Sequence, residues 1–210
     1  MNGVEAPTGA ADRTLAPGDV VQWDYRDWAA TPHVPAIVGA FPEPFLHGQK
    51  GVRYPTRIEC ANGTKSCDTV QSALDRAGVN TGTSALGLEA RGGVLRIEVG
   101  KWSALRDLQG IDVLEQGPSA SGVYARFSPD GSQLLLLDAT GAVVRRAPPG
   151  TGLIAAVIPR GQQPLWVVTG VDEAGVARAA ALLSAAKLRN AYAVAALPSR
   201  PIRLPLESGR

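Results

Sequence analysis

The chain has 210 residues, of which 45% are hydrophobic and 19% are charged, and its formal net charge is +2. This composition suffices for one large or two small packed domains and excludes a largely disordered protein. The charges are mixed in order and form no polybasic run, which argues against nucleic acid as a partner. No stretch of ~18 apolar residues could span a bilayer, and the first residues lack the pattern of a signal peptide.

The first 28 residues are typical of the end of a β-domain. Asn2-Gly3 predicts a turn, yet only Met1 precedes it, so the strand that should lead into this turn is missing. Pro17-Gly18-Asp19 predicts a second turn. The alternation of Val21, Trp23 and Tyr25 with polar residues then predicts a half-buried strand over Val20 to Trp28. We therefore expect a β-hairpin remnant here.

Three pieces of this region, NGVEA, Gly9-Ala10 and LAPGDVVQWDY, resemble the closing portion of the transcobalamin-like C-terminal β-domain family. In that family a helix and further strands come earlier, so the resemblance implies that the β-domain is truncated at its start. It also implies a lost lipoprotein leader, an extracellular or envelope location, and a small ligand such as a corrinoid. The unpaired edge of the strand Val20 to Trp28 predicts self-association through that edge.

Residues 29–51 form a segment rich in proline and aromatic residues. Its four prolines forbid a regular helix, and the apolar run from Val34 to Phe41 predicts a short buried strand before an extended linker. We place a domain boundary near residue 50. The predicted organisation is the closing part of a β-domain at 1–28, a linker at 29–51, an α/β domain at 52–197 and an extended tail at 198–210.

The α/β domain is predicted from alternating strand and helix patterns. Strands are expected over 56–61, 93–100, 164–170 and 191–197, and helices over 67–79, 102–117 with a break at Gly110, and 172–190. Asp68 with Gln71 predicts a capping box for the first helix, and Gly78 should end it. Residues 80–91 are expected to be a loop, and 152–159 is too short and apolar to classify by its period.

A hairpin is predicted around Pro129-Asp130-Gly131, followed by a third short strand over 143–147. The two strand–helix–strand arrangements, at 56–99 and 165–196, indicate an α+β fold. It would consist of an N-terminal β-hairpin remnant of a small β-domain and a mixed-sheet α/β layered domain.

Cys60 and Cys67 stand seven positions apart, at the expected end of a strand and the start of a helix. This spacing suits a disulfide. Two buried thiols are the alternative, and a two-ligand metal site is a further one, although the second pair that a closed zinc site requires is absent.

The sequence contains few groups for catalysis. There is no Gly-x-Ser-x-Gly motif, and the glycines at 170 and 175 have the spacing of a phosphate-binding loop but lack its lysine, so Asp172 and Glu173 should simply cap a helix. The residues of metal-ligand or acid–base type that lie in one neighbourhood are Asp24, Asp27, His33, Glu43 and His47. Their spacing matches no closed motif, so solvated loop positions are the favoured interpretation.

Aromatic side chains among prolines can form a platform for an apolar ligand or a sugar. The candidates are Trp23, Tyr25, Trp28, Phe41 and Phe45, and packing between the two halves of the chain is their alternative role.

Three functions follow as hypotheses. The first is a non-catalytic extracellular or envelope-associated protein that binds a corrinoid-like or other small ligand, without a cofactor or bound metal. A structural or interaction module of the envelope is the second, and a hydrolase using the Asp24, Asp27, His33 and His47 neighbourhood is the third. Nucleic acid is not expected as a partner, and the membrane would be reached only through the missing N-terminal lipid anchor.

Overall fold

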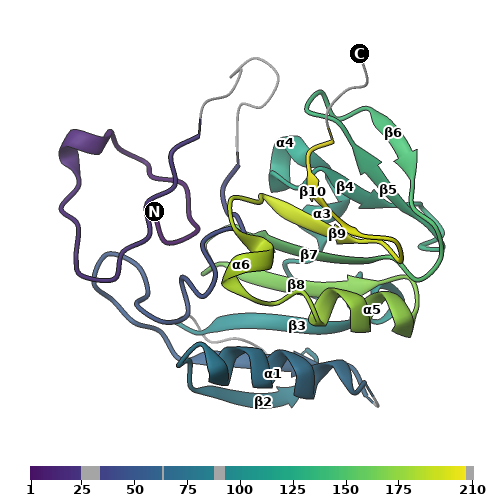
Figure 1. The fold of residues 1–210 in the computed structure, drawn as a ribbon, viewed down its shortest axis with the longest axis horizontal. Helices are drawn as coiled ribbons and strands as arrows, with labels where there is room; N and C mark the ends of the chain where they lie inside the picture. Colours follow the sequence, from purple (N-terminus) through teal and green to yellow (C-terminus); the bar gives the residue numbers. More distant parts are fainter. Residues whose placement is uncertain (25–33, 63, 88–92, 207–210) are drawn as a thin grey trace.

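The computed structural model of the chain describes residues 1–24, 34–62, 64–87 and 93–206. These residues form a large mixed sheet with helices on one face and a small sheet with short helices on the other (Figure 1). Each face of the large sheet carries its own apolar core. The predicted α+β class with a mixed sheet is confirmed.

The large sheet has seven strands. In spatial order they are β10 (Pro201–Leu204), β9 (Ala193–Ala196), β7 (Gly152–Val157), β8 (Leu165–Gly170), β3 (Leu95–Lys101), β1 (Thr56–Cys60) and β2 (Thr81–Ala85). The strands β2, β1, β3 and β8 are parallel, whereas β7, β9 and β10 each pair antiparallel to their neighbours. Every residue of β7 and β8 is buried because both faces are covered, which explains why the apolar run at 152–159 shows no period.

The helices α1 (Ser66–Arg76) and α5 (Glu173–Ala180) cover one face of this sheet. The buried side of α1 contains Val70, Ala73 and Leu74, as predicted. The predicted capping box is not formed, because the helix begins at Ser66 and Asp68 lies inside its first turn. Capping by an acidic residue does occur in α5, where Asp172 Oδ1 accepts a hydrogen bond of 2.7 Å from Gly175 N–H.

The helix predicted over 172–190 is two helices. After α5 the chain tightens through hydrogen bonds of the i+3 type from Leu182 N–H and Leu183 N–H, becomes extended at Ser184, and resumes as α6 (Ala185–Leu188). Helical spacing predicts that Leu183 lies on the buried face and Arg178 on the exposed one, and both are found there. The apolar period is therefore kept although the helix is interrupted.

A second layer packs on the opposite face. It contains the small sheet β4 (Ala125–Phe127), β5 (Leu134–Leu137) and β6 (Val143–Arg146), with the helices α2 (Trp102–Leu105), α3 (Asp112–Glu115) and α4 (Pro118–Ser121). The predicted hairpin is confirmed, since β4 and β5 pair antiparallel across the turn at 129–131. The rings of Trp102 and Phe127 stack with their centroids 4.2 Å apart.

The disulfide between Cys60 and Cys67 is present, and the two Cα atoms are 6.2 Å apart. It joins the end of β1 to the first turn of α1. A disulfide that closes so short a loop stabilises the folded state by roughly 2 to 3 kcal/mol. No helix in the described parts of the chain is long and apolar enough to cross a membrane.

Two segments contain a strand where none was predicted. The expected loop at 80–91 includes β2, which has small polar residues and owes its conformation to the parallel ladder with β1. The expected tail at 198–210 includes β10, which adds to the sheet beside β9. Both are edge strands. β2 has no alternating apolar pattern, whereas β10 has a short one in Ile202 and Leu204 on either side of Arg203.

The predicted N-terminal hairpin is not formed in the part of the chain that the structure describes. Residues 1–24 contain one short 3-10 helix (Ala10–Asp12) and no strand. Asn2 N–H does donate to the Val20 carbonyl at 2.8 Å, but this pairing does not extend into a ladder, and Val4 forms an isolated bridge with Ala36 of a later segment. The rest of the predicted strand, 25–28, lies outside the described residues. The domain boundaries proposed from the sequence stay predictions.

The segment at 34–48, predicted to contain a linker, forms turns that contribute to the core. Phe41 and Phe45 are buried against Trp166 of β8, with ring centroids 6.0 Å and 5.1 Å away. The alternative role of these two aromatic residues, packing between the two halves of the chain, is therefore the one that the structure supports.

Candidate functional site

The N-terminal segment is held in place by the side chain of Asn2, which is buried. Its amide nitrogen donates hydrogen bonds of 2.8 Å to Asp19 Oδ1 and to the Gly48 carbonyl, and its oxygen accepts one of 2.8 Å from Val20 N–H. A backbone φ of 50° at Asn2 is tolerated best by asparagine and glycine. Hydrogen bonds from the Ala16 N–H and from Asn2 lower the pKa of Asp19. One side chain thus ties together three stretches of the chain.

The same segment is connected to the large sheet through residues 34–39. Glu5 N–H donates to the Pro35 carbonyl at 3.0 Å, and Ile37 N–H donates to the Gly3 carbonyl at 2.8 Å. Gly39 lies so close to Ala191 that a Cβ atom added at Gly39 would be 2.6 Å from the backbone nitrogen of Ala191. These contacts place the N-terminal segment beside the chain that leads from α6 into β9.

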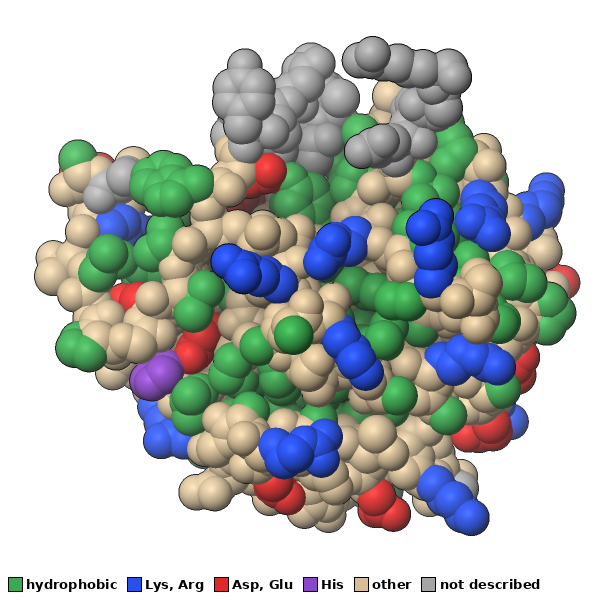
Figure 2. Space-filling view, in the orientation of Figure 1, with side chains coloured by type: hydrophobic (Ala, Val, Ile, Leu, Met, Phe, Trp, Pro, Cys, Tyr) green, Lys and Arg blue, Asp and Glu red, His purple; other side chains and the backbone are tan. Residues whose placement is uncertain are grey.

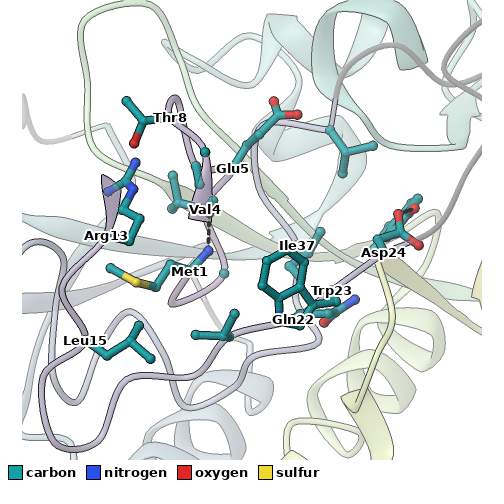
Figure 3. A pocket seen from close by; sticks show the side chains of 16 residues that line it. Met1, Val4, Glu5, Thr8, Arg13, Leu15, Gln22, Trp23, Asp24 and Ile37 are labelled. Atoms are coloured by element: carbon teal, nitrogen blue, oxygen red, sulfur yellow. Dashed lines mark hydrogen bonds between the residues drawn. The ribbon is translucent and has the colours of Figure 1, made fainter. Parts of the chain in front are cut away.

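An open cleft of about 500 Å³ lies within this N-terminal segment (Figure 3). Its apolar lining consists of Met1, Val4, Leu15, Val21, Trp23, Val34 and Ile37. Its polar lining comes mainly from Glu5, Arg13, Gln22, Asp24 and Tyr192. In Figure 3 Arg13 and Leu15 stand on one side of the opening, while Trp23 and Asp24 stand on the other. The volume falls within the range typical of small-molecule sites, roughly 300 to 1,000 Å³.

Trp23 is the predicted aromatic residue that the structure places at this cleft, and its side chain is 76% exposed. Phe41 and Phe45 are in the core, and Tyr25 and Trp28 lie outside the described residues. The five predicted ligand-binding residues therefore do not form one platform among the described residues. Trp23 shares the cleft with Leu15 and Val21, which are 60% and 41% exposed, and exposed apolar side chains grouped in this way are typical of binding surfaces.

Arg13 is the polar residue that sequence analysis missed. Its Nε atom is buried and has no hydrogen-bond partner among the described residues. Arg13 as a whole is half-buried and lines the cleft, so its guanidinium group can meet a ligand acceptor such as a carboxylate, sulfonate or carbonyl group. On the opposite side of the cleft, the Tyr192 hydroxyl donates to Asp24. No motif in the sequence identified Arg13, because its environment depends on contacts between distant segments.

The predicted metal-binding or acid–base neighbourhood is not assembled among the described residues. Glu43 and His47 do meet, with Glu43 Oε1 and His47 Nδ1 2.5 Å apart, but Glu43 Oε2 also accepts from His47 N–H at 2.9 Å. Both carboxylate oxygens thus hold the turn that ends at His47. Asp24 contacts Tyr192 instead, and Asp27 and His33 lie outside the described residues. The described parts of the chain contain no group of three or more His, Cys, Asp or Glu side chains with metal-binding geometry.

A buried charge network on β1 and β3 is a further feature that sequence analysis missed. Glu59 and Glu98 are register partners on these neighbouring strands, and both are fully buried. Each is paired with an arginine two residues earlier on its own strand, Arg57 at 2.7 Å and Arg96 at 3.0 Å. The tripeptide Arg-Ile-Glu, which occurs in both strands, is the sequence signal that could have revealed this network.

The second oxygen of each of these carboxylates has no hydrogen-bond partner among the described residues. Burial raises the pKa of Glu98 to about 7, against the opposing effect of Arg96 and with a further contribution from Glu59. Because neither carboxylate is exposed, a ligand cannot reach this pair in the described conformation. We therefore assign the network to stability and take the N-terminal cleft as the candidate site.

Comparison with known proteins gives no match to this chain: no family model fits it, and no curated protein or solved structure is similar to it. The geometry of the cleft is therefore the basis for a functional proposal.

Proposed function

We propose that this protein is a non-catalytic binding protein whose N-terminal cleft holds a small organic ligand. The observation that carries the proposal is the combination of an open cleft of about 500 Å³, a highly exposed Trp23 at its rim, and the half-buried cation Arg13 in its lining. An aromatic face and a cationic donor together match a ligand with a flat apolar body and an anionic or carbonyl group.

The chemistry of the lining limits the ligand class. Leu15, Val21 and Ile37 give an apolar surface, which favours a ring or hydrocarbon over a fully hydroxylated sugar. Arg13 favours an acceptor at one end of the ligand. A corrinoid, which the resemblance to the transcobalamin-like family implies, belongs to the proposal as the large member of this class.

The test is a binding assay with three probes: 8-anilinonaphthalene-1-sulfonate, which has aromatic rings and an anionic group, cyanocobalamin, and cellobiose. We expect 8-anilinonaphthalene-1-sulfonate to bind most clearly. Its binding is measured by fluorescence, and that of cyanocobalamin by equilibrium dialysis. Arg13→Ala and Trp23→Ala should each weaken binding about tenfold, the typical effect of a lost charged hydrogen bond or a lost aromatic contact.

Two control variants separate the cleft from the general surface. Arg126→Ala removes an exposed arginine on β4, and Val52→Ala trims an exposed apolar residue outside the cleft. Neither should change the affinity. If all three probes fail to bind, or if the controls weaken binding as much as Arg13→Ala does, the proposed function is wrong.

We also propose that the protein works outside the cytoplasm, at the cell envelope. The Cys60–Cys67 disulfide supports this proposal, because disulfides persist mainly in oxidising compartments. Thiol labelling of the protein immediately after it is taken from its native cells would test it. Full labelling of both cysteines without reductant would contradict an oxidising location.

A further inference from the structure

The unit formed by α5, α6, β9 and β10 has an unusual charge pattern. From Ala174 to Leu206 the chain contains no Asp, Glu or His. It contains five cationic residues, all exposed, and we call them the basic face: Arg178, Lys187, Arg189, Arg200 and Arg203. The sequence shows no basic run here, because the five are spread over 26 positions.

The cations of the basic face have no acidic partner among the described residues. Arg178 donates to the Gly150 carbonyl at 2.7 Å, and Lys187 donates to the Ala181 carbonyl at 2.8 Å. The arginines on β1, β3 and after α2 differ, since each of those pairs with a glutamate. Uncompensated cations repel one another, so this surface is suited to an anionic partner.

These residues come to one side of the large sheet through its topology. On β10, Ile202 and Leu204 pack against the second core, so Arg203 between them points to the opposite face, the one that α5 and α6 cover. In the view of Figure 2, Lys and Arg side chains are spread over the surface above α5, α6 and β10, while the Asp and Glu side chains lie toward the edges or on the side of the N-terminal segment. The cations thus spread over a broad surface.

Exposed apolar residues border the basic face. Tyr192, three positions after Arg189, lines the same cleft as Trp23, which is 76% exposed. Leu15 is 60% exposed and Val21 is 41% exposed on the same N-terminal segment. Basic residues next to exposed tryptophan and aliphatic side chains are typical of protein surfaces that rest on a bilayer, where cations meet lipid headgroups and apolar groups enter the interface.

We propose that the basic face, with the neighbouring apolar residues, docks the protein on an anionic bilayer surface. Each cation near an anionic membrane strengthens partitioning roughly fivefold, so five give binding that is substantial at low salt and reversible at high salt. The exposed apolar side chains favour a bilayer over a soluble polyanion, which offers nothing for them to enter. The basic face contains no residue of the cleft lining, so the electrostatic part of docking does not depend on the ligand of the cleft.

The experiment is co-sedimentation of the full chain with large unilamellar vesicles. Vesicles of 70% phosphatidylcholine and 30% phosphatidylglycerol should bind the protein in 50 mM salt and release most of it in 300 mM salt, while pure phosphatidylcholine vesicles should bind little. The double variant Arg189→Gln with Arg203→Gln should weaken partitioning roughly 25-fold.

A matched double variant, Arg126→Gln with Arg160→Gln, removes the same charge from exposed residues outside the basic face and should change partitioning less than about threefold. Circular dichroism confirms that both variants fold. Equal loss in both variants would mean that net charge alone acts, and would overturn the proposal. Binding to duplex DNA or polyphosphate without binding to anionic vesicles would overturn it as well, in favour of a soluble polyanion.

Discussion

The N-terminal segment at 1–24 and the layered region built on the large sheet are held together by different interactions. The layered region buries two apolar cores, and its largest side chains, such as Trp102 and Trp166, are almost completely removed from water. The N-terminal segment leaves Leu15, Val21 and Trp23 exposed, and the polar side chain of Asn2 is its main anchor. The layered region is therefore held together mainly by apolar burial, whereas the N-terminal segment depends on hydrogen bonds.

Two groups of residues depart from this contrast. In the layered region, Glu59 and Glu98 are buried carboxylates among apolar strands. Beside the N-terminal segment, Phe41 and Phe45 anchor the segment at 34–48 in the core against Trp166. These exceptions show that the boundary between a stable scaffold and a binding region is set by burial rather than by residue type. Three predictions test the contrast.

The largest effect is expected for Phe45→Ala. Phe45 is 1% exposed and contacts Trp166, so its removal should lower the free energy of unfolding by about 3 to 5 kcal/mol. Trp23→Ala removes an aromatic side chain that is 76% exposed, and it should change the free energy of unfolding by less than about 0.5 kcal/mol. Urea titration of both variants makes the measurement. A large loss for Trp23→Ala would show that the N-terminal segment is part of the stable scaffold.

The next effect concerns pH. The pKa of Glu98 is raised to about 7 in the folded protein from a usual 4.5, so the folded state holds a proton that the unfolded state has released. The contribution of Glu98 to the free energy of unfolding is therefore fully present below pH 4.5. It falls by up to about 3 kcal/mol as the pH rises from 4.5 through 7. Urea titrations at pH 5 and pH 8 should show the loss in the natural protein.

Glu98→Gln provides the comparison, because its amide keeps an oxygen toward Arg96 and carries no charge. This variant should lose less stability between pH 5 and pH 8 than the natural protein does. Glu115→Gln, at an exposed ion pair with Arg106, is the control and should keep the natural pH dependence. Equal slopes for Glu98→Gln and the natural protein would contradict a raised pKa.

The third prediction concerns Asn2→Ala, for which we expect a local rather than a global effect. This change removes three hydrogen bonds that hold the N-terminal segment, yet the layered region has cores of its own. We expect faster proteolytic cleavage within residues 1–24 and a shift of less than about 1 kcal/mol in the free energy of global unfolding, because the segment opens locally. Asn62→Ala, at an exposed asparagine, should leave both unchanged. A full loss of cooperative folding would mean that the two regions fold as one unit.

Much of the layered region could be predicted because its signals are local. The hairpin at 129–131 follows from turn residues between two apolar runs, and the buried side of α1 follows from helical spacing. The edge strand β2 could not be predicted, since its small polar residues take a strand conformation only beside β1. The break between α5 and α6 was missed because the apolar period continues through it.

The candidate site was predicted less well for a related reason. Trp23 was identified as an aromatic residue in a segment with turns, but the same argument applied equally to Phe41 and Phe45, which are buried. Arg13 carries no motif, and its buried Nε depends on neighbours brought together by folding. Residue type indicates what a side chain can bind, whereas its exposure is decided by what packs over it.

The sequence by itself determined the α+β class, the hairpin, the helix faces and the Cys60–Cys67 disulfide, because each depends on residues within a few positions of one another. Only the tertiary structure decided the cleft, the pairing of Glu59 with Glu98, and the basic face. These three features join residues from strands and helices that are distant in the chain. Periodicity and turn chemistry report the local backbone, and they contain no information about which distant segment will cover a given side chain or leave it exposed.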